Sequence, residues 1–193
     1  GSDDTFNQML SYLSEGDYIV GFIPFHEDSH LGKLFGIDSL LSAAKTIAGR
    51  RVERLDVGLV GSSYFLTHVE FGPTLNDFRN AGWLELPRIM RDTKQWKINI
   101  DDQYTLQANG IGGMIFNTRY ASDESQVGNP TDGILDVLLT EGMGSFQSWK
   151  LRDQLKAGLL EQLPGATKLS CKKLEILEPK GIPVSIAGHV VTK

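Results

Sequence analysis

The spacing of apolar residues changes near Arg50, and this change limits the possible folds more than any other feature. Before Arg50, apolar side chains recur at helical intervals in residues 5–13 and 30–49. After it, residues 52–59 alternate between polar and apolar, and residues 64–69 follow a Gly-Ser-Ser turn, as antiparallel strands do. The sequence therefore predicts an α+β protein with a helical first part and mainly antiparallel β-structure after it.

Later segments extend the β-rich part. Residues 96–100 and 104–107 flank Asp101-Asp102-Gln103 as the strands of a hairpin flank its turn. Further strands are predicted at residues 114–118, 134–139, 174–177 and 184–191. So many short strands favour an antiparallel β-sandwich. One helix is expected among them near residues 145–163, with Ser145 as its N-cap.

The first part of the chain is expected to open as helix, strand and helix. Residues 18–25 form a short apolar run bounded by Gly16 and Pro24, which predicts a buried strand. Gly36 is expected to end the next helix and Asp38 to cap the one after it. Residues 73–93 show no readable pattern, so no element is predicted there.

Composition excludes several classes of protein. Of the 193 residues, 40% are apolar, which is enough for a core, and the net charge is -5. The 19 Lys and Arg residues form no basic run, so no nucleic-acid partner is expected. Cys171 is the single cysteine, so no intrachain disulfide can form, which fits a reducing cytoplasm. No apolar run reaches the roughly 18 to 20 residues that span a bilayer, and we expect a soluble chain.

Two loops far apart in the sequence have residues suited to ligand binding. The first is Gly1-Ser2-Asp3-Asp4-Thr5-Phe6-Asn7, where glycine at a helix start would let backbone N–H groups approach a phosphate. The second is Asn129-Pro130-Thr131-Asp132-Gly133-Ile134-Leu135-Asp136. Taken singly, the first loop is explained equally well as the capped start of a helix that binds no ligand. The second, taken singly, is explained by a simple hairpin turn.

Together the two loops resemble the GGDGTxN loop and the DDGxLD turn of the diacylglycerol kinase and sphingosine kinase family. Three stretches between them also resemble family motifs in the same order. They are Leu34-Phe35-Gly36-Ile37 (ALGI), residues 52–66 (VxRxDxGxVxxxYFL) and residues 108–114 (a glycine-rich strand). The resemblance thus covers nearly the whole chain.

The resemblance implies a fold and an activity. The fold is an antiparallel β-sandwich like the C-terminal domain of lipid kinases and NAD kinases over residues 37–193, preceded by the remnant of an α/β nucleotide-binding subdomain in residues 1–36. The activity is ATP-dependent phosphorylation of a lipid hydroxyl, with ATP and Mg²⁺ as cofactors. A lipid such as diacylglycerol is the implied substrate, and peripheral membrane contact and a homodimer are further interactions that it leaves open.

The resemblance also implies a set of site residues. The residues implied to bind the nucleotide are Gly1, Ser2, Asp3, Asp4, Thr5, Phe6, Asn7 and Glu27. Mg²⁺ binding falls to the side chain of Asp132 and to the carbonyls of Asn129 and Ile134, which suit a hard cation. The family's DGE, which supplies the proposed base, reads Ala187-Gly188-His189 here, so His189 stands at the position of the base.

Several of these positions depart from the family pattern. Ser2 and Asp4 replace glycines of the first loop. Residues 24–31 resemble the family's second phosphate loop, PxGTxND, and Glu27 stands there at the position of the phosphate-contacting threonine. Carboxylates therefore lie where a phosphate would bind. We therefore expect weak or absent kinase activity. The alternative is a non-catalytic nucleotide-binding, lipid-binding or regulatory domain.

A third hypothesis comes from His26-Glu27-Asp28-Ser29-His30, which matches the HExxH zinc motif. A distant carboxylate such as Glu53 or Glu70 would complete the ligand set of a zinc hydrolase. The motif follows Pro24 directly instead of lying inside a helix, so zinc is not favoured.

Overall fold

The computed structural model describes residues 3–13, 16–25, 29–37, 39–50, 52–120, 126–186 and 189–192. The helices are α1 (Asp3–Leu13), α2 (His30–Leu34), α3 (Leu40–Ala48), α4 (Leu75–Asn80), α5 (Glu85–Arg91), α6 (Ser145–Lys150), α7 (Arg152–Ala157) and the 3-10 helix η1 (Leu160–Gln162). The strands are β1 (Gly58–Val60), β2 (Ser63–Phe65), β3 (His68–Phe71), β4 (Lys94–Ile100), β5 (Tyr104–Gly110), β6 (Gly112–Phe116), β7 (Arg119–Tyr120), β8 (Gln126–Val127), β9 (Leu135–Thr140), β10 (Ala166–Cys171), β11 (Leu174–Glu178), β12 (Val184–Ile186) and β13 (His189–Thr192).

The strands form one large sheet and several smaller ones. The large sheet has six strands in the order β10-β9-β6-β3-β12-β13, and a second sheet has the order β11-β4-β5. The pairs β1-β2 and β7-β8 form short two-stranded sheets. Every pairing among the described strands is antiparallel. The expected α+β class with mainly antiparallel sheets is confirmed.

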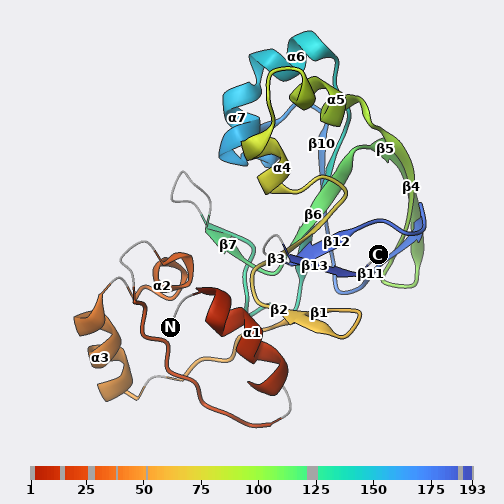
Figure 1. Cartoon of the computed structure of the whole chain (residues 1–193). Coiled ribbons are helices and arrows are strands. Elements are labelled where there is room, and N and C mark those ends of the chain that lie inside the picture. Colours follow the sequence, from red (N-terminus) through yellow and green to blue (C-terminus); the bar gives the residue numbers. More distant parts are fainter. Residues whose placement is uncertain are drawn as a thin grey trace.

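The helices lie at two ends of the molecule, with the sheets between them (Figure 1). Helices α4 to α7 cover the upper end, and apolar side chains of α4, α5 and α7 form one core cluster with residues of β6 and β9, including Phe78, Met90, Met114, Leu138 and Leu155. Fully burying one such side chain stabilises the fold by about 1.5–3 kcal/mol. This cluster attaches the helical end to the large sheet.

A second core cluster joins the two larger sheets. It contains Phe71 of β3 and Val137 of β9 from the large sheet, and Trp96 and Ile98 of β4 from the three-stranded sheet. The rings of Phe71 and Trp96 meet edge to face, with centroids 5.1 Å apart, and the Trp96 indole donates to the carbonyl of Gly110 at 2.9 Å.

Helices α1 and α2 pack through a third, smaller cluster. Phe6 of α1 meets Phe22 and Phe35 with ring centroids 5.6 and 6.3 Å away, and Leu31 and Leu66 lie in the same cluster. Leu66 directly follows β2, so this cluster holds α1 against the β1–β2 hairpin. That contact positions the candidate site described below.

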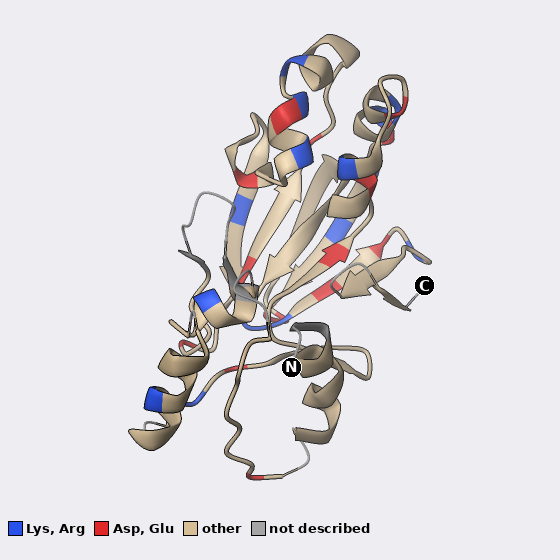
Figure 2. Cartoon of the chain, turned by 60° about the vertical axis from the view of Figure 1, so that its left-hand side comes forward, with Lys and Arg blue, Asp and Glu red and all other residues tan. Residues whose placement is uncertain are grey.

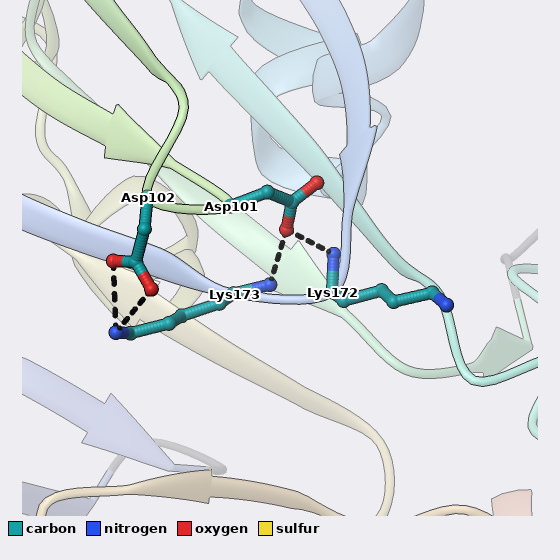
Figure 3. A network of polar contacts seen from close by, with 4 residues as sticks. All are labelled: Asp101, Asp102, Lys172 and Lys173. Carbon is teal, nitrogen blue, oxygen red and sulfur yellow. Dashed lines mark hydrogen bonds and ion pairs between the residues drawn. The ribbon is translucent and has the colours of Figure 1, made fainter.

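A polar network ties the turn between β4 and β5 to the turn between β10 and β11 (Figure 3). Asp101 Oδ1 accepts hydrogen bonds from the backbone N–H groups of Lys172 and Lys173, each at 2.8 Å. The Lys173 ammonium group donates to both carboxylate oxygens of Asp102 at 2.8 Å, and this pairing raises the pKa of Lys173. The network fixes one end of the three-stranded sheet.

Most of the expected strands are present. The hairpin at Asp101-Asp102-Gln103 is confirmed as β4 and β5, with Asp101 and Asp102 both in the left-handed region at φ 53° and 57°. Residues 114–118, 134–139 and 174–177 correspond to β6, β9 and β11, and the stretch expected at 184–191 contains the paired strands β12 and β13. The helix expected near residues 145–163 is divided into α6, α7 and η1.

Some expectations are wrong. Residues 18–25 form no strand, and Tyr18 and Ile19 are exposed, because none of the described strands lies beside them to pair with. Residues 52–57 likewise have no regular structure, and the strand begins only at Gly58. The N-cap of α3 is Ser39, which forms a capping box with Ser42, and not Asp38. The N-cap position of α6 is Gly144, and not Ser145, so no side chain caps this helix.

The glycine-rich segment serves backbone packing, as expected. A Cβ at Gly113 would collide with the carbonyl oxygen of Leu138 on the paired strand β9, and one at Gly112 would collide with that of Phe71. The small residue therefore allows the close approach of neighbouring backbones in the middle of the large sheet.

Candidate functional site

A pocket of about 380 Å³ lies where α1, the β1–β2 hairpin and the β12–β13 hairpin meet. Its lining residues come from three distant parts of the sequence. They are Asn7, Gln8 and Ser11 of α1, Ser62, Ser63 and Tyr64 at the β1–β2 turn, and Ile186, His189 and Val191 of the β12–β13 hairpin. Helix α1 reaches this place because the cluster around Phe6 and Leu66 holds it against β2.

The pocket brings together two of the residues implied by the family resemblance. Asn7, from the expected nucleotide loop, and His189, at the position of the family's base, both line it. The Oδ1 atom of Asn7 is shielded from solvent and accepts no hydrogen bond from the described part of the chain. A buried amide oxygen without a donor is unfavourable, so this atom is suited to accept a hydrogen bond from a ligand.

The chemical character of the pocket is neutral and polar. Its described lining contains hydroxyl, amide and imidazole groups but no Lys, Arg, Asp or Glu side chain. Such groups can orient a hydroxyl or a phosphate oxygen by hydrogen bonds, but they supply no fixed charge to neutralise a triphosphate. His189 is exposed and is the one imidazole among these lining residues.

The remaining residues of the expected nucleotide loop are placed differently. Helix α1 begins at Asp3, so the helix expected over residues 5–13 is confirmed, whereas Asp3 and Asp4 are helical where an open loop was expected. Asp4 stands where the family pattern has glycine, and aspartate disfavours a helix somewhat less than glycine does. Thr5 is exposed, whereas Phe6 points into the apolar cluster with Phe22. Gly1, Ser2 and Glu27 lie outside the described residues, as do the side chains of Asp3 and Asp4.

The expected metal-binding turn is a compact loop before β9. Asp132 Oδ1 accepts a hydrogen bond from Ile134 N at 2.9 Å, and Asn129 Oδ1 accepts from the N–H and the hydroxyl of Thr131 at 3.2 and 2.8 Å. Gly133 adopts φ 69° and donates its N–H to Asp56 Oδ2 at 2.7 Å. The side chains are thus used in part to shape the turn itself.

This turn has oxygen atoms of the kind that coordinate a hard cation. Asp132 and Asp56 hydrogen-bond to the adjacent residues Ile134 and Gly133, so two carboxylates flank one short stretch of backbone. Carboxylate and carbonyl oxygens are the ligands of Mg²⁺ in proteins. Among the described residues there is no cluster of three or more His, Cys, Asp or Glu side chains, so a cation here would draw on backbone carbonyls and water as well.

Sequence reasoning missed Asp56 and the hydroxyls of Ser62 and Ser63. Asp56 is held between distant segments, since its N–H donates to the carbonyl of Pro130 at 2.6 Å and its carbonyl accepts from Asn117 Nδ2 at 2.7 Å. The sequence signal for it was the aspartate of the VxRxDxG stretch. The serines were visible only as a turn, and nothing local indicates that this turn faces α1.

The zinc motif is not supported by the backbone around it. Residues 26–28 and the side chain of His30 lie outside the described residues. Ser29 is the N-cap of α2 and has an extended backbone, with φ -61° and ψ 121°. Helix α2 thus begins only at His30, whereas the HExxH motif requires a helix that is already continuous over the four residues before its second histidine. Glu70, named as a third ligand, is buried and accepts from Leu75 N at 2.8 Å.

Comparison with known proteins supports one fold. No family model matches the sequence, and no curated protein is similar to it. Among solved structures, a "putative diacylglycerol kinase" from Bacillus anthracis str. Sterne has a TM-score of 0.70 and 18% identity, over 98% of this chain and 69% of that one. The chain has the diacylglycerol kinase fold.

Two further structures agree with this diacylglycerol kinase fold. A second "putative diacylglycerol kinase" from the same organism has a TM-score of 0.66 and 18% identity, over 100% of this chain and 71% of that one. A structure described as a diacylglycerol kinase, again from Bacillus anthracis str. Sterne, has a TM-score of 0.68 and 16% identity, over 99% of this chain and 68% of that one. The resemblance found in the motifs is confirmed at the level of the fold.

Proposed function

We propose that the chain is a lipid kinase-like protein whose pocket between α1 and the β12–β13 hairpin corresponds to a phosphotransfer site, with weak or absent transfer activity of its own. The observation that carries this proposal is that Asn7 and His189, from opposite ends of the sequence, line the same pocket. Fold similarity alone does not assign an activity. The joint placement of two motif positions in one cavity supports a shared site.

The reaction proposed is transfer of the γ-phosphoryl group of ATP to a lipid hydroxyl, for which diacylglycerol is the model substrate. Such transfer needs a group that takes the hydroxyl proton, and cations that neutralise the phosphates. In this chain the His189 imidazole is the available proton acceptor, and the amide of Asn7 would contact the nucleotide, as the family resemblance implies. Mg²⁺ would be held by Asp132 and by the carbonyls of Asn129 and Ile134, and would supply charge neutralisation when bound.

The proposed loss of activity follows from what the pocket lacks. Its described lining has His189 and no carboxylate at the position of the family's base, and no Lys or Arg to hold a triphosphate. In the same scheme, residues 1–36 are the remnant of the nucleotide-binding subdomain and residues 37–193 the β-sandwich domain.

Among the described residues, no helix has the length and apolar character needed to cross a bilayer.

A radiolabelled transfer assay tests the proposal. The full-length protein is incubated with labelled ATP, Mg²⁺ and diacylglycerol in mixed detergent micelles, and labelled lipid is counted. We expect a transfer rate well below that of an active diacylglycerol kinase measured in parallel. Robust turnover by this protein would overturn the proposed loss of activity.

A non-catalytic binding domain is the second candidate function. The neutral lining of the pocket favours it, since hydroxyl and amide groups bind polar ligands without providing a strong base. Isothermal titration calorimetry separates the two candidates. Heat from ATP with Mg²⁺, but no transfer, indicates a kinase-derived nucleotide binder, whereas heat from a soluble short-chain diacylglycerol alone indicates a lipid-binding domain.

A further inference from the structure

Large apolar side chains are exposed together at the end of the molecule that α4 to α7 form, which we call the helical end. Trp83 and Leu84, between α4 and α5, are 60% and 79% exposed, and Phe146 of α6 is 80% exposed. We call these three residues, with Trp149 of α6, the tryptophan surface. Contiguous apolar groups left in water are costly and mark an interaction site more often than single exposed residues do.

The tryptophan surface is held in a fixed arrangement. The rings of Trp83 and Trp149 stack with centroids 4.9 Å apart and planes inclined by 18°. The indole N–H of Trp149 donates to the carbonyl of Trp83 at 3.1 Å, which ties the loop before α5 to helix α6. A surface that is already ordered loses little conformational entropy when it binds.

A groove with apolar walls and two arginines adjoins this surface. It has a volume of about 870 Å³ and lies between α5 and α6. Its lining residues are Leu84, Pro87, Arg88, Ile89, Arg91, Asp92, Ser145 and Trp149. Guanidinium groups beside apolar side chains match a ligand that is anionic at one end and apolar at the other.

The charge of the helical end differs in sign from that of the rest of the chain. Residues 73–94 and 145–163 contain seven Lys or Arg and five Asp or Glu, a net charge of +2. The other residues contain twelve and nineteen, a net charge of -7. Figure 2 shows basic positions on the helices of the upper end. An anionic surface would therefore attract this end and repel the remainder.

We propose that the tryptophan surface docks the protein on an anionic phospholipid bilayer. Trp83, Leu84 and Phe146 enter the interfacial region, where tryptophan is favoured, and Arg88 and Arg91 contact lipid phosphates. An uncharged apolar partner would match the exposed rings but would leave the arginines and the charge asymmetry without a role. The docking does not depend on phosphotransfer, and it adds attachment to a membrane to the proposed function.

Tryptophan fluorescence of the wild-type protein provides a direct test. The chain has three tryptophans, and Trp96 is only 1% exposed, so a spectral change on binding reports Trp83 and Trp149. We expect phosphatidylserine-containing phosphatidylcholine vesicles to shift the emission to the blue and to co-sediment the protein, with weaker effects from pure phosphatidylcholine. Lipids brominated on the acyl chains are expected to quench the emission.

Matched variants assign the binding to this surface. Leu84→Ser with Phe146→Ser is expected to lower the vesicle partition coefficient about tenfold or more through lost apolar contact. Arg88→Gln with Arg91→Gln is expected to lower it about fivefold per arginine on anionic vesicles. Tyr104→Ser, an equally exposed aromatic at the β4–β5 turn, and Lys168→Gln with Lys180→Gln are the controls, and we expect them to bind as the wild type does.

Several results would overturn this proposal. They are no co-sedimentation of the wild type, equal binding to neutral and anionic vesicles, or equal losses in the control variants. A dimer in sedimentation velocity that Leu84→Ser with Phe146→Ser dissociates would assign the surface to a second copy instead. Circular dichroism checks the fold of each variant, and quenching in the wild type stands without any variant. Transfer in detergent micelles does not require docking, so failure there concerns only the proposed phosphotransfer site.

Discussion

The carboxylate of Asp56 accepts a hydrogen bond from the backbone N–H of Gly133 at 2.7 Å, across 77 residues of sequence. The backbone of Asp56 adds two more bonds, one to the carbonyl of Pro130 and one from the side chain of Asn117. The buried Asn117 amide also donates to the carbonyl of Leu66 at 2.9 Å. Asp56 and Asn117 thus connect the proposed cation-binding turn to the segment around Leu66, against which α1 packs.

Asp56→Ala is expected to loosen this turn. Removing a carboxylate that accepts from a backbone N–H lowers the free energy of unfolding by about 1–2 kcal/mol. Urea denaturation followed by circular dichroism measures the loss. Glu53→Ala, an exposed carboxylate three residues earlier, is the control and is expected to change stability by less than about 0.5 kcal/mol. Equal losses in the two variants would show that the bond to Gly133 contributes nothing.

Asp101 and Asp102 offer a second comparison, because both have left-handed backbones and an alanine is strained equally at each. Asp101 accepts from two backbone N–H groups, whereas Asp102 pairs with the exposed side chain of Lys173. Asp101→Ala is therefore expected to lose about 2 kcal/mol of stability for its two bonds, and Asp102→Ala clearly less. Thermal unfolding of both variants measures the difference, and the reverse order would contradict it.

Sequence reasoning succeeded where structure is set locally. The β4–β5 hairpin follows from two alternating segments around Asp101-Asp102, and both turn residues adopt the left-handed conformation that aspartate tolerates. It failed where structure depends on distant partners. Residues 18–25 have the composition of a buried strand, but a strand forms only beside another strand, and the described sheets offer none there. Helices α4 and α5, of six and seven residues, are too short for helical periodicity to be visible.

The candidate site shows the same limit. Motif order identified Asn7 and His189 as members of one family site, and the pocket contains both. The turn at Ser62 and Ser63 reaches the pocket only because α1 packs on the hairpin, which no local pattern indicates. The role of Asp56 was equally hidden, because its partner Gly133 lies 77 residues away.

Gly113 is expected to be one of the least replaceable residues of the large sheet. A Cβ there would collide with the Leu138 carbonyl oxygen and would lie 2.7 Å from the ring of Phe71. Gly113→Ala should therefore lower the free energy of unfolding by about 2–3 kcal/mol, measured by urea denaturation. Gly82→Ala meets no atom within 4 Å, so it is the control, with an expected change within about 0.5 kcal/mol. A Gly113→Ala variant as stable as the control would contradict this close packing.

The buried thiol of Cys171 predicts a loss of stability at alkaline pH. Burial raises the pKa of Cys171 from its ordinary value of 9.0 to about 11, and the charges of Asp101 and Asp136 add to the rise. A raised pKa in the folded state favours folding of the neutral thiol, so its contribution is complete below about pH 9 and is lost as the pH rises towards 11.

Cys171→Ala isolates this contribution from the titration of Lys and Tyr residues. Between about pH 8 and about pH 11, the wild type is expected to lose about 2 kcal/mol more stability than the variant does. Urea denaturation at a series of pH values measures both curves. Parallel curves for the two proteins would show that the thiol titrates alike in the folded and unfolded states.

Restoring a carboxylate at position 189 tests whether the pocket retains a phosphotransfer geometry. His189→Glu returns the residue type of the family's base to a side chain that lines the pocket. We expect transfer from labelled ATP to diacylglycerol to rise above the wild-type rate, by less than the roughly hundredfold that a positioned base contributes, because the His189 imidazole already accepts a proton there. Ala187→Asp added to it should raise the rate further, because it completes the family motif.

Gln8→Glu is the matched control for this gain of activity, since it adds the same charge to another residue that lines the pocket. It should leave the transfer rate unchanged, because a base acts only from the position that reaches the substrate hydroxyl. Equal gains from His189→Glu and Gln8→Glu would mean that charge alone matters. No gain from His189→Glu with Ala187→Asp, while calorimetry still detects ATP binding, would favour the non-catalytic domain.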